Sequence, residues 1–462
     1  MNARPPHLWR GRLVGLLSDY GMLGVLVILG IFFSILTVAD QYPTGADGAA
    51  AVAESLAARD VSAQDVLIVG RATHEDSLFV AHLRSLLESR GLRVAGALLG
   101  DPFAIRERLG QGASAAVVAA PAALRSILEG LRQGAPEPAA LTLVTPAPSR
   151  WPTFLLADNL RNVANQIAVI AIIAIGMTMV IIAGGIDLSA GSLIALSAVL
   201  TAWFIEALGG NAASTGGMIF ASLGAIVVCG LAGAFSAWMI TGFRIPPFIA
   251  TLAMMQVGAG VAYIISQGLP LYQIPDGFIW LGRGTEPLLR IPNAVLLMIA
   301  LYAIAHLVMT RTVFGRYIYA VGGNPEAARL AGVRVHRVQY AVYTLCGALA
   351  GLGGVIMASQ LKSGAPTYGA GYELNVIAAV VVGGASLSGG EGRVLGTLIG
   401  ALVIGVIQNG MNLTNVESYT QKVVLGLVIL AAVLIDQLKH RGMARGWRFL
   451  RRPTVASERD KS

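Results

Sequence analysis

Residues 184–192 read GGIDLSAGS and interrupt one of the most apolar parts of the chain. AVIAIIAIGMTMVIIA (168–183) directly precedes them, and LIALSAVLTAWFI (193–205) directly follows. A carboxylate that faces lipid is costly, and non-helical backbone at membrane depth is tolerated only where protein or water covers it. The stretch is therefore predicted to be a helix break whose polar groups face the interior of a helix bundle.

Four residues of this break are candidates for a transport pathway or a tight packing site, namely Gly184, Gly185, Asp187 and Ser189. Glycines loosen a helix, and broken helices form the substrate and ion sites of many transporters. The alternative is a plain turn on the cytoplasmic side of the membrane, in which Asp187 caps the helix that follows.

The composition of the whole chain indicates a membrane protein. Of its 462 residues 55% are hydrophobic and 13% are charged, whereas a soluble domain has roughly 25% charged residues. Apolar runs of about 17 to 25 residues recur, and each is long enough to cross a bilayer as a helix. The net charge of +8 does not indicate nucleic acid binding, because the basic residues cluster between apolar runs rather than on a soluble face. The predicted fold class is an all-α polytopic membrane protein with about ten transmembrane helices.

The first predicted span covers 21–38, after a cytoplasmic N-terminus at 1–20. TVA before Asp40 leaves open a cleaved signal peptide instead. The rest of the transmembrane part is expected to cover 155–440. Its spans are predicted near 162–183, 190–208, 216–240, 246–266, 293–310, 338–359, 374–388, 394–413 and 419–436.

Charge predicts the orientation of these spans. The segments assigned to the inner side are rich in arginine, and the basic tail at 441–462 adds more, whereas the short outer segments carry few basic residues. This asymmetry places both termini in the cytoplasm by the positive-inside rule. The inner segments contain Arg4, Arg10, Arg12, Arg244, Arg311, Arg316, Arg329, Arg334, Arg337 and Arg393.

Residues 45–150 are not membrane-like, and they follow the first span, so they are predicted to form an inserted small α/β domain in the periplasm. His74, Glu75 and Asp76 follow its first strand, where open α/β sheets bind ligands; alternatively they form a solvated loop in which Asp76 or Ser77 caps the next helix. The predicted strands are 65–70, 92–100, 115–120 and 139–145, and the predicted helices are 77–91, 101–112 and 122–134.

A second stretch resembles the opening one. GGASLSG at 383–389 again ends an apolar run, 199 residues further along the chain, with Gly383, Gly384 and Ser386 in place of Gly184, Gly185 and Asp187. Such an echo is expected where a transporter is built from two related halves.

The chain resembles the permease subunits of bacterial ABC importers for simple sugars, of the ribose and xylose type. The resemblance is carried by GGIDLSAGS, by RIPPFIATLAMM (244–255), by GRYIYAVGGNPEAARLAGVRV (315–335) and by VVVGGASLSGGEGRVLGTLIGALVIGVIQNGMNL (380–413). It covers about 155–440 and the first span. The segment 45–150 departs from it, because typical members have a short outer loop there.

The resemblance implies a multi-pass protein of the bacterial inner membrane that moves a monosaccharide by alternating access. The implied partners are a cytoplasmic ABC ATPase, a periplasmic substrate-binding protein, a second permease in a homodimer or heterodimer, and membrane lipid. No enzymatic activity, catalytic residue, cofactor or metal is expected. In agreement, no lysine of the chain follows a glycine as a P-loop requires; the lysines are Lys362, Lys422, Lys439 and Lys461.

The longest inner loop contains NPEAARLAG (324–332), which has the signals of a short helix. Asn324 is a good N-cap, Pro325 suits the first helical position, Glu326 favours the positive helix end, and Gly332 is a typical terminator. By the resemblance, this is the coupling helix that docks on the ATPase, with Glu326 and Arg329 as a polar rim and Ala328 on a small-residue docking surface. The alternative is an amphipathic helix lying on the membrane surface.

Three other functions are left open by the residues. Related permeases for branched-chain amino acids or nucleosides share parts of these motifs. An ion-coupled secondary transporter would use Asp187 as its proton or sodium site. A membrane-anchored receptor would use the segment 45–150 as a sensor and would transport nothing.

Overall fold

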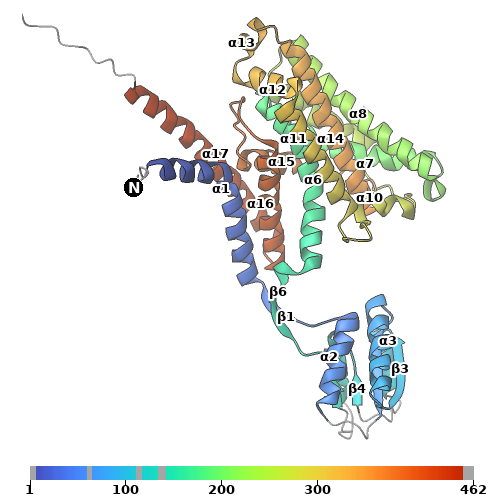
Figure 1. Cartoon of the computed structure of the whole chain (residues 1–462). Helices are drawn as coiled ribbons and strands as arrows, with labels where there is room; N and C mark the ends of the chain where they lie inside the picture. Colours follow the sequence, from blue (N-terminus) through green and yellow to red (C-terminus); the bar gives the residue numbers. More distant parts are fainter. Residues whose placement is uncertain (1–6, 60–64, 111–116, 134–141, 451–462) are drawn as a thin grey trace, which may run out of the picture. The chain divides into compact units, whose positions relative to one another are not determined.

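The computed structural model contains two compact units, one formed by residues 1–37 with 154–462 and the other by Val38–Thr153 (Figure 1). The residues described by the structure are 7–59, 65–110, 117–133 and 142–450. The basic tail predicted at 441–462 and the N-terminus predicted at 1–20 therefore lie only partly within the described residues.

The first unit is helical throughout its described length apart from short connections. Its helices are α1 (His7–Leu36), α6 (Ala157–Ile182), α7 (Ala190–Ala207), α8 (Thr215–Gly242), α9 (Pro247–Ser266), α10 (Trp280–Arg283), α11 (Asn293–Arg311), α12 (Val313–Gly323), α13 (Pro325–Leu330), α14 (Val335–Leu361), α15 (Tyr372–Val382), α16 (Val394–Leu413) and α17 (Ser418–Leu450).

Among the described residues, seven helices are long and apolar enough to cross a membrane: α6, α7, α8, α9, α11, α14 and α16. They agree with predicted spans, and they support a polytopic membrane protein. Three further apolar helical segments are shorter, namely Gly21–Leu36, Tyr372–Val382 and Ser418–Leu434.

Helix α15 corrects the span predicted at 374–388. It has 11 residues, which at about 1.5 Å per residue span roughly half of a 30 Å hydrocarbon layer. The helix ends at Val382 because the glycines that follow turn the chain. The segment before it, from Lys362 to Gly371, is not helical, so it does not extend α15 to the length of a full span.

Helix α6 forms the centre of the core of the helical unit. In its most apolar 18-residue stretch 89% is buried, whereas the corresponding share is 28% in α8 and in α9. Helix α14 packs against α6, α7 and α8. Small residues permit this approach: a methyl group on Gly176 would lie 2.7 Å from the Cys346 Cα atom. Cys229 and Cys346 are free and fully buried, as expected of packing residues.

The second unit contains a parallel sheet in the order β3-β2-β4-β5, formed by Val66–Arg71 (β2), Val94–Gly100 (β3), Val117–Ala119 (β4) and Thr142–Val144 (β5). Side chains of α2 (Gly45–Ala57) and α3 (His74–Ser89) cover one face, and those of α4 (Pro102–Gly110) and α5 (Arg125–Gln133) cover the other.

This three-layer arrangement contains the alternation of strands and helices predicted from the sequence. Helix α2 was not predicted from the sequence, because its alanine-rich stretch has no flanking pattern of its own. An antiparallel ribbon that pairs Val38–Gln41 (β1) with Ser149–Pro152 (β6) and holds the two ends of the unit together was not predicted either.

In the polar cluster of His74, Glu75 and Asp76 after strand β2, Asp76 is buried and has a structural role. Asp76 is 4% exposed and accepts hydrogen bonds from the Arg71 backbone N–H and from Arg71 Nε, at 2.9 and 2.8 Å. Helix α3 is capped by Thr73, which accepts from the Asp76 N–H at 3.2 Å, and not by Asp76 or Ser77 as predicted. Burial of the Asp76 carboxyl raises its pKa, but the hydrogen bonds from Arg71 outweigh this and hold the pKa below its usual value.

Asp76→Asn is expected to lower the thermal unfolding midpoint of residues 38–153, expressed as a fragment, by about 5 °C or more, because Arg71 loses a charged partner. The stabilisation by the carboxylate is complete above the unfolded pKa of about 3.9 and is lost as the pH falls through the lower folded pKa. The difference between wild type and variant should therefore narrow below about pH 4. Circular dichroism melts measure it.

The control is Glu88→Gln, because the Arg84–Glu88 pair has side chains that are 59% and 56% exposed. Exposed pairs contribute little. Equal melting of the Asp76 and Glu88 variants would contradict a stabilising role for Asp76.

Candidate functional site

The first break is a helix C-terminus closed by two backbone hydrogen bonds. The Gly184 N–H donates to the Ile181 carbonyl and the Gly185 N–H donates to the Val180 carbonyl, both at 2.9 Å. This pair of bonds is a Schellman motif, which requires a left-handed residue, and Gly184 has φ +83°. The break at the predicted position thus leaves few backbone groups of α6 unpaired.

Asp187 follows this cap and is fully buried in protein. Its Oδ1 atom accepts from the Ser189 backbone N–H at 2.9 Å and from the Ser189 hydroxyl at 2.6 Å, just before α7 begins at Ala190. The contacts are those of a turn former, as in the alternative interpretation of the sequence, but the carboxyl does not lie at an exposed surface.

The second carboxyl oxygen, Oδ2, has no hydrogen-bond partner within ordinary geometric limits among the described residues. The Tyr343 hydroxyl of α14 is likewise unpartnered there, and a methyl group on Gly185 would overlap it. The Cys346 thiol, one helical turn along α14, also interacts with the Asp187 carboxyl. The break and one face of α14 therefore form a cluster of buried polar groups.

The second break repeats the geometry of the first. The Gly384 N–H donates to the Val381 carbonyl at 2.9 Å, the Ala385 N–H donates to the Val380 carbonyl at 3.1 Å, and Gly384 has φ +89°. In the turn that follows, Ser386 Oγ accepts from the Ser388 N–H at 3.2 Å, as Asp187 accepts from Ser189.

This repeat corrects the alignment of the two glycine pairs. The left-handed glycines Gly184 and Gly384 are 200 residues apart, whereas the turn residues Asp187 and Ser386 are 199 apart. Gly383 has φ −68° and occupies the preceding position, equivalent to Ala183. The second break is thus one residue shorter between cap and turn.

The structure brings the two breaks into direct contact. The Gly390 N–H, at the end of the second break, donates to the carbonyl of Ile182, the last residue of α6, at 2.8 Å. Helix α12 joins them, because the Tyr319 hydroxyl donates to the Gly392 carbonyl at 2.8 Å and Gly322 packs against Ile182. This role of Gly322, Gly389 and Gly390 was not predicted from the sequence, although each belongs to a pair of adjacent glycines.

Helix α13 has the start and stop predicted for it. Asn324 Oδ1 accepts from the Ala327 N–H at 3.0 Å, Pro325 is at the first helical position, and Gly332 has φ +86° after the helix. Glu326 and Arg329 form an exposed ion pair at 2.7 Å.

The expectation that Ala328 lies on a docking surface is corrected. Ala328 is 5% exposed and belongs to the main hydrophobic core of the helical unit, because it faces inward from the six-residue helix. The outward face carries Leu330 instead, which is 85% exposed. The exposed position of Leu330 was not predicted from the sequence, because fewer than two turns of helix do not show which face is buried.

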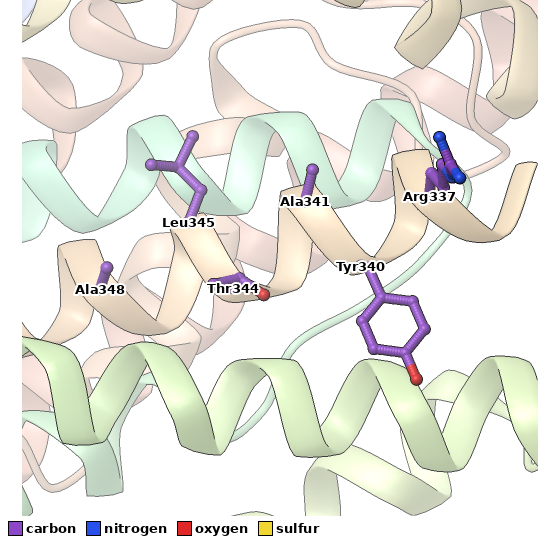
Figure 2. A pocket seen from close by; sticks show the side chains of 6 residues that line it. All are labelled: Arg337, Tyr340, Ala341, Thr344, Leu345 and Ala348. Carbon is purple, nitrogen blue, oxygen red and sulfur yellow. The ribbon is translucent and has the colours of Figure 1, made fainter. Parts of the chain in front are cut away.

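A shallow groove of about 490 Å³ runs along one side of α14, away from the residues that face Asp187. Figure 2 shows its side chains in a row on that helix, with the cationic Arg337 at one end. It contains no acid–base pair and none of the predicted site residues. The lining residues are Arg337, Tyr340, Ala341, Thr344, Leu345 and Ala348.

Comparison with known proteins connects this geometry to transporters. The chain is 43% identical over 305 residues to the ribose import permease of Escherichia coli K12, covering 65% of the chain and 92% of that protein. It is 43% identical to the ribose import permease of Bacillus subtilis 168, covering 62% of the chain and 87% of the relative. Identity to the L-arabinose transport system permease of E. coli K12 is 38%, covering 63% and 86%.

No solved structure matches the chain. The family model for the permease component of the branched-chain amino acid transport system matches residues 159–433, a range that includes both breaks and α13. Since this range is more than half of the chain, the protein belongs to that permease family, and its similarity to the ribose and arabinose permeases makes it a permease of the ribose-type sugar ABC importers.

Proposed function

We propose that the chain is the transmembrane subunit of an importer that carries a monosaccharide across the bacterial inner membrane, driven by ATP hydrolysis on a separate subunit. The observation that carries the proposal is the 43% identity to ribose import permeases over almost their whole length. The solute is a pentose or a closely related sugar, because the named relatives import ribose and arabinose. Branched-chain amino acids, nucleosides and ion-coupled transport through Asp187 are not favoured by these relatives.

The proposed arrangement has ten crossings. The seven long spans are joined by the apolar parts of α1 and α17 and by the short α15, which crosses together with the non-helical segments before and after it. Both termini, including 1–20 and the tail 441–462, lie in the cytoplasm, and two permease subunits of the 155–440 type, identical or related, form the pathway. The unit Val38–Thr153, which contains the predicted domain 45–150, faces the periplasm, where a substrate-binding protein delivers the sugar.

Helix α13 is proposed to dock on the ATPase. Its buried Ala328 fixes it to the permease, and its exposed Leu330 is an apolar anchor of the size that fills a pocket on a partner. The Glu326–Arg329 pair at the edge of this anchor forms a polar rim. Alternating access follows if closure of the ATPase subunits moves α13 and, with it, the helices that enclose the pathway.

Leu330→Asp is expected to abolish copurification of the ATPase and to reduce sugar uptake by about tenfold or more, because a buried unpaired charge replaces the anchor. Leu288→Asp is the matched control: Leu288 is 84% exposed, in the loop between α10 and α11. Figure 1 shows α10 and α13 at opposite ends of the helical unit. Uptake and copurification are measured with the ATPase and binding protein present.

Two outcomes would contradict the proposal. One is that Leu330→Asp binds the ATPase and transports as the wild type does. The other is that collapse of the proton gradient stops uptake while the ATP concentration is held constant.

The orientation is tested by labelling with a membrane-impermeant maleimide. Cys229 and Cys346 are fully buried, so an introduced cysteine is the accessible thiol. Ser85→Cys, on the exposed side of α3, should react in intact spheroplasts. Ala331→Cys, after α13, should react only once the membrane is permeabilised; the reverse pattern would invert the proposed topology.

Asp187→Leu is expected to lower uptake by about tenfold or more with normal insertion, because the Ser189 N–H and hydroxyl lose their buried acceptor. Asp187→Asn keeps an acceptor oxygen and should retain most of the activity. Uptake is compared at equal amounts of protein in the membrane. Equal loss in both variants would show that the charge is required, and full activity of the leucine variant would reduce Asp187 to a replaceable residue.

A further inference from the structure

The end of α12 and the two breaks meet in what we call the glycine junction, formed by Gly184, Gly322, Gly389 and Gly390. We infer that this junction is the point at which movement of α13 is passed to both breaks at once. The inference rests on the proposed function of α13 as the ATPase docking helix.

At the junction, backbones touch without intervening side chains. A methyl group on Gly322 would overlap the Ile182 carbonyl oxygen and would lie 2.6 Å from the Gly390 nitrogen. One on Gly389 would lie 2.8 Å from the Gly322 oxygen and 3.0 Å from the Gly184 Cα atom. Close-packed atoms transmit displacement because the interior has little free volume to absorb it.

Two hydrogen bonds link the same three segments. The Gly390 N–H donates to the Ile182 carbonyl at 2.8 Å, which ties the second break to the end of α6. The Tyr319 hydroxyl donates to the Gly392 carbonyl at 2.8 Å, which ties α12 to the second break. The junction is therefore held by directional bonds as well as by contact.

Helix α12 is joined to α13 without a flexible linker. Asn324 is at once the residue that ends α12 and the N-cap of α13. Val321 near the end of α12 and Ala328 in α13 are both buried in the main core. A displacement of α13 is consequently passed to Gly322 through only two intervening residues, Gly323 and Asn324.

The junction reaches both halves of the permease part. Gly184 lies between α6 and α7, and Gly390 lies between α15 and α16. A displacement of Gly322 therefore acts on the ends of both helix pairs. The Asp187 turn follows Gly184 directly, so the buried polar groups of the first break shift with it.

The test compares two adjacent glycines. Gly322→Ala places a methyl group against the Ile182 carbonyl, whereas Gly323→Ala places one where no atom lies within 4 Å. Each variant is reconstituted in liposomes with the ATPase and the binding protein, and the number of ATP molecules hydrolysed per sugar imported is measured. Gly322→Ala should raise this ratio by about tenfold with ATPase copurification intact, and Gly323→Ala should leave it unchanged.

A second variant keeps the test decisive if Gly322→Ala does not insert in the membrane. Tyr319→Phe removes the hydroxyl without adding volume, and the loss of one hydrogen bond should raise the ratio by about fivefold. Wild-type ratios for Tyr319→Phe, together with a wild-type ratio or failed insertion of Gly322→Ala, would overturn the inference. A rise in the ratio for Gly323→Ala equal to that for Gly322→Ala would also overturn it.

Leu330→Asp separates this inference from the proposed function. If Leu330→Asp leaves ATPase binding and uptake intact, the docking role of α13 is wrong. If Leu330→Asp abolishes both while the junction variants remain fully coupled, the docking role holds and the junction is not the point of transmission.

Discussion

The need to pair every buried backbone N–H and C=O group determines how this protein interrupts its apolar helices. A buried break is possible here because each of the two helix ends is closed by its own Schellman bonds. The Ile182 carbonyl, which α6 leaves free, is taken by the Gly390 N–H of the other break. Each break thus supplies what the other lacks, and both depend on glycine to come close enough.

The two breaks share a backbone plan but differ in chemistry. Asp187 and Ser386 accept a hydrogen bond from the residue two positions later, so either side chain is sufficient to form the turn. Aspartate brings a second oxygen that serine does not, and in the described residues this oxygen is left without an ordinary hydrogen-bond partner. The two breaks therefore end their helices in the same way while presenting different polar groups to the interior.

Periodicity and composition were sufficient to predict the long spans, the strand and helix alternation in the second unit, and the start and stop of α13. These features depend on residues close together in the sequence. The buried position of Ala328, the short α15 and the junction of Gly184, Gly322 and Gly390 were not predicted. They depend on which distant segments meet, and a contact between glycines has no hydrophobic pattern to reveal it. The resemblance to sugar permeases identified the important motifs, but it did not show which side of each one faces protein.

The ribbon of β1 and β6 brings together the two ends of the unit Val38–Thr153. Val38 lies opposite Pro152 and Gln41 lies opposite Ser149, so the chain enters and leaves the unit on neighbouring strands. A unit whose two ends lie side by side can occupy the position of a single loop, because the residues before and after it need not be far apart. The named relatives align with 62–65% of this chain. Because the two ends of the unit lie on paired strands, a short loop in its place would be enough to close the chain.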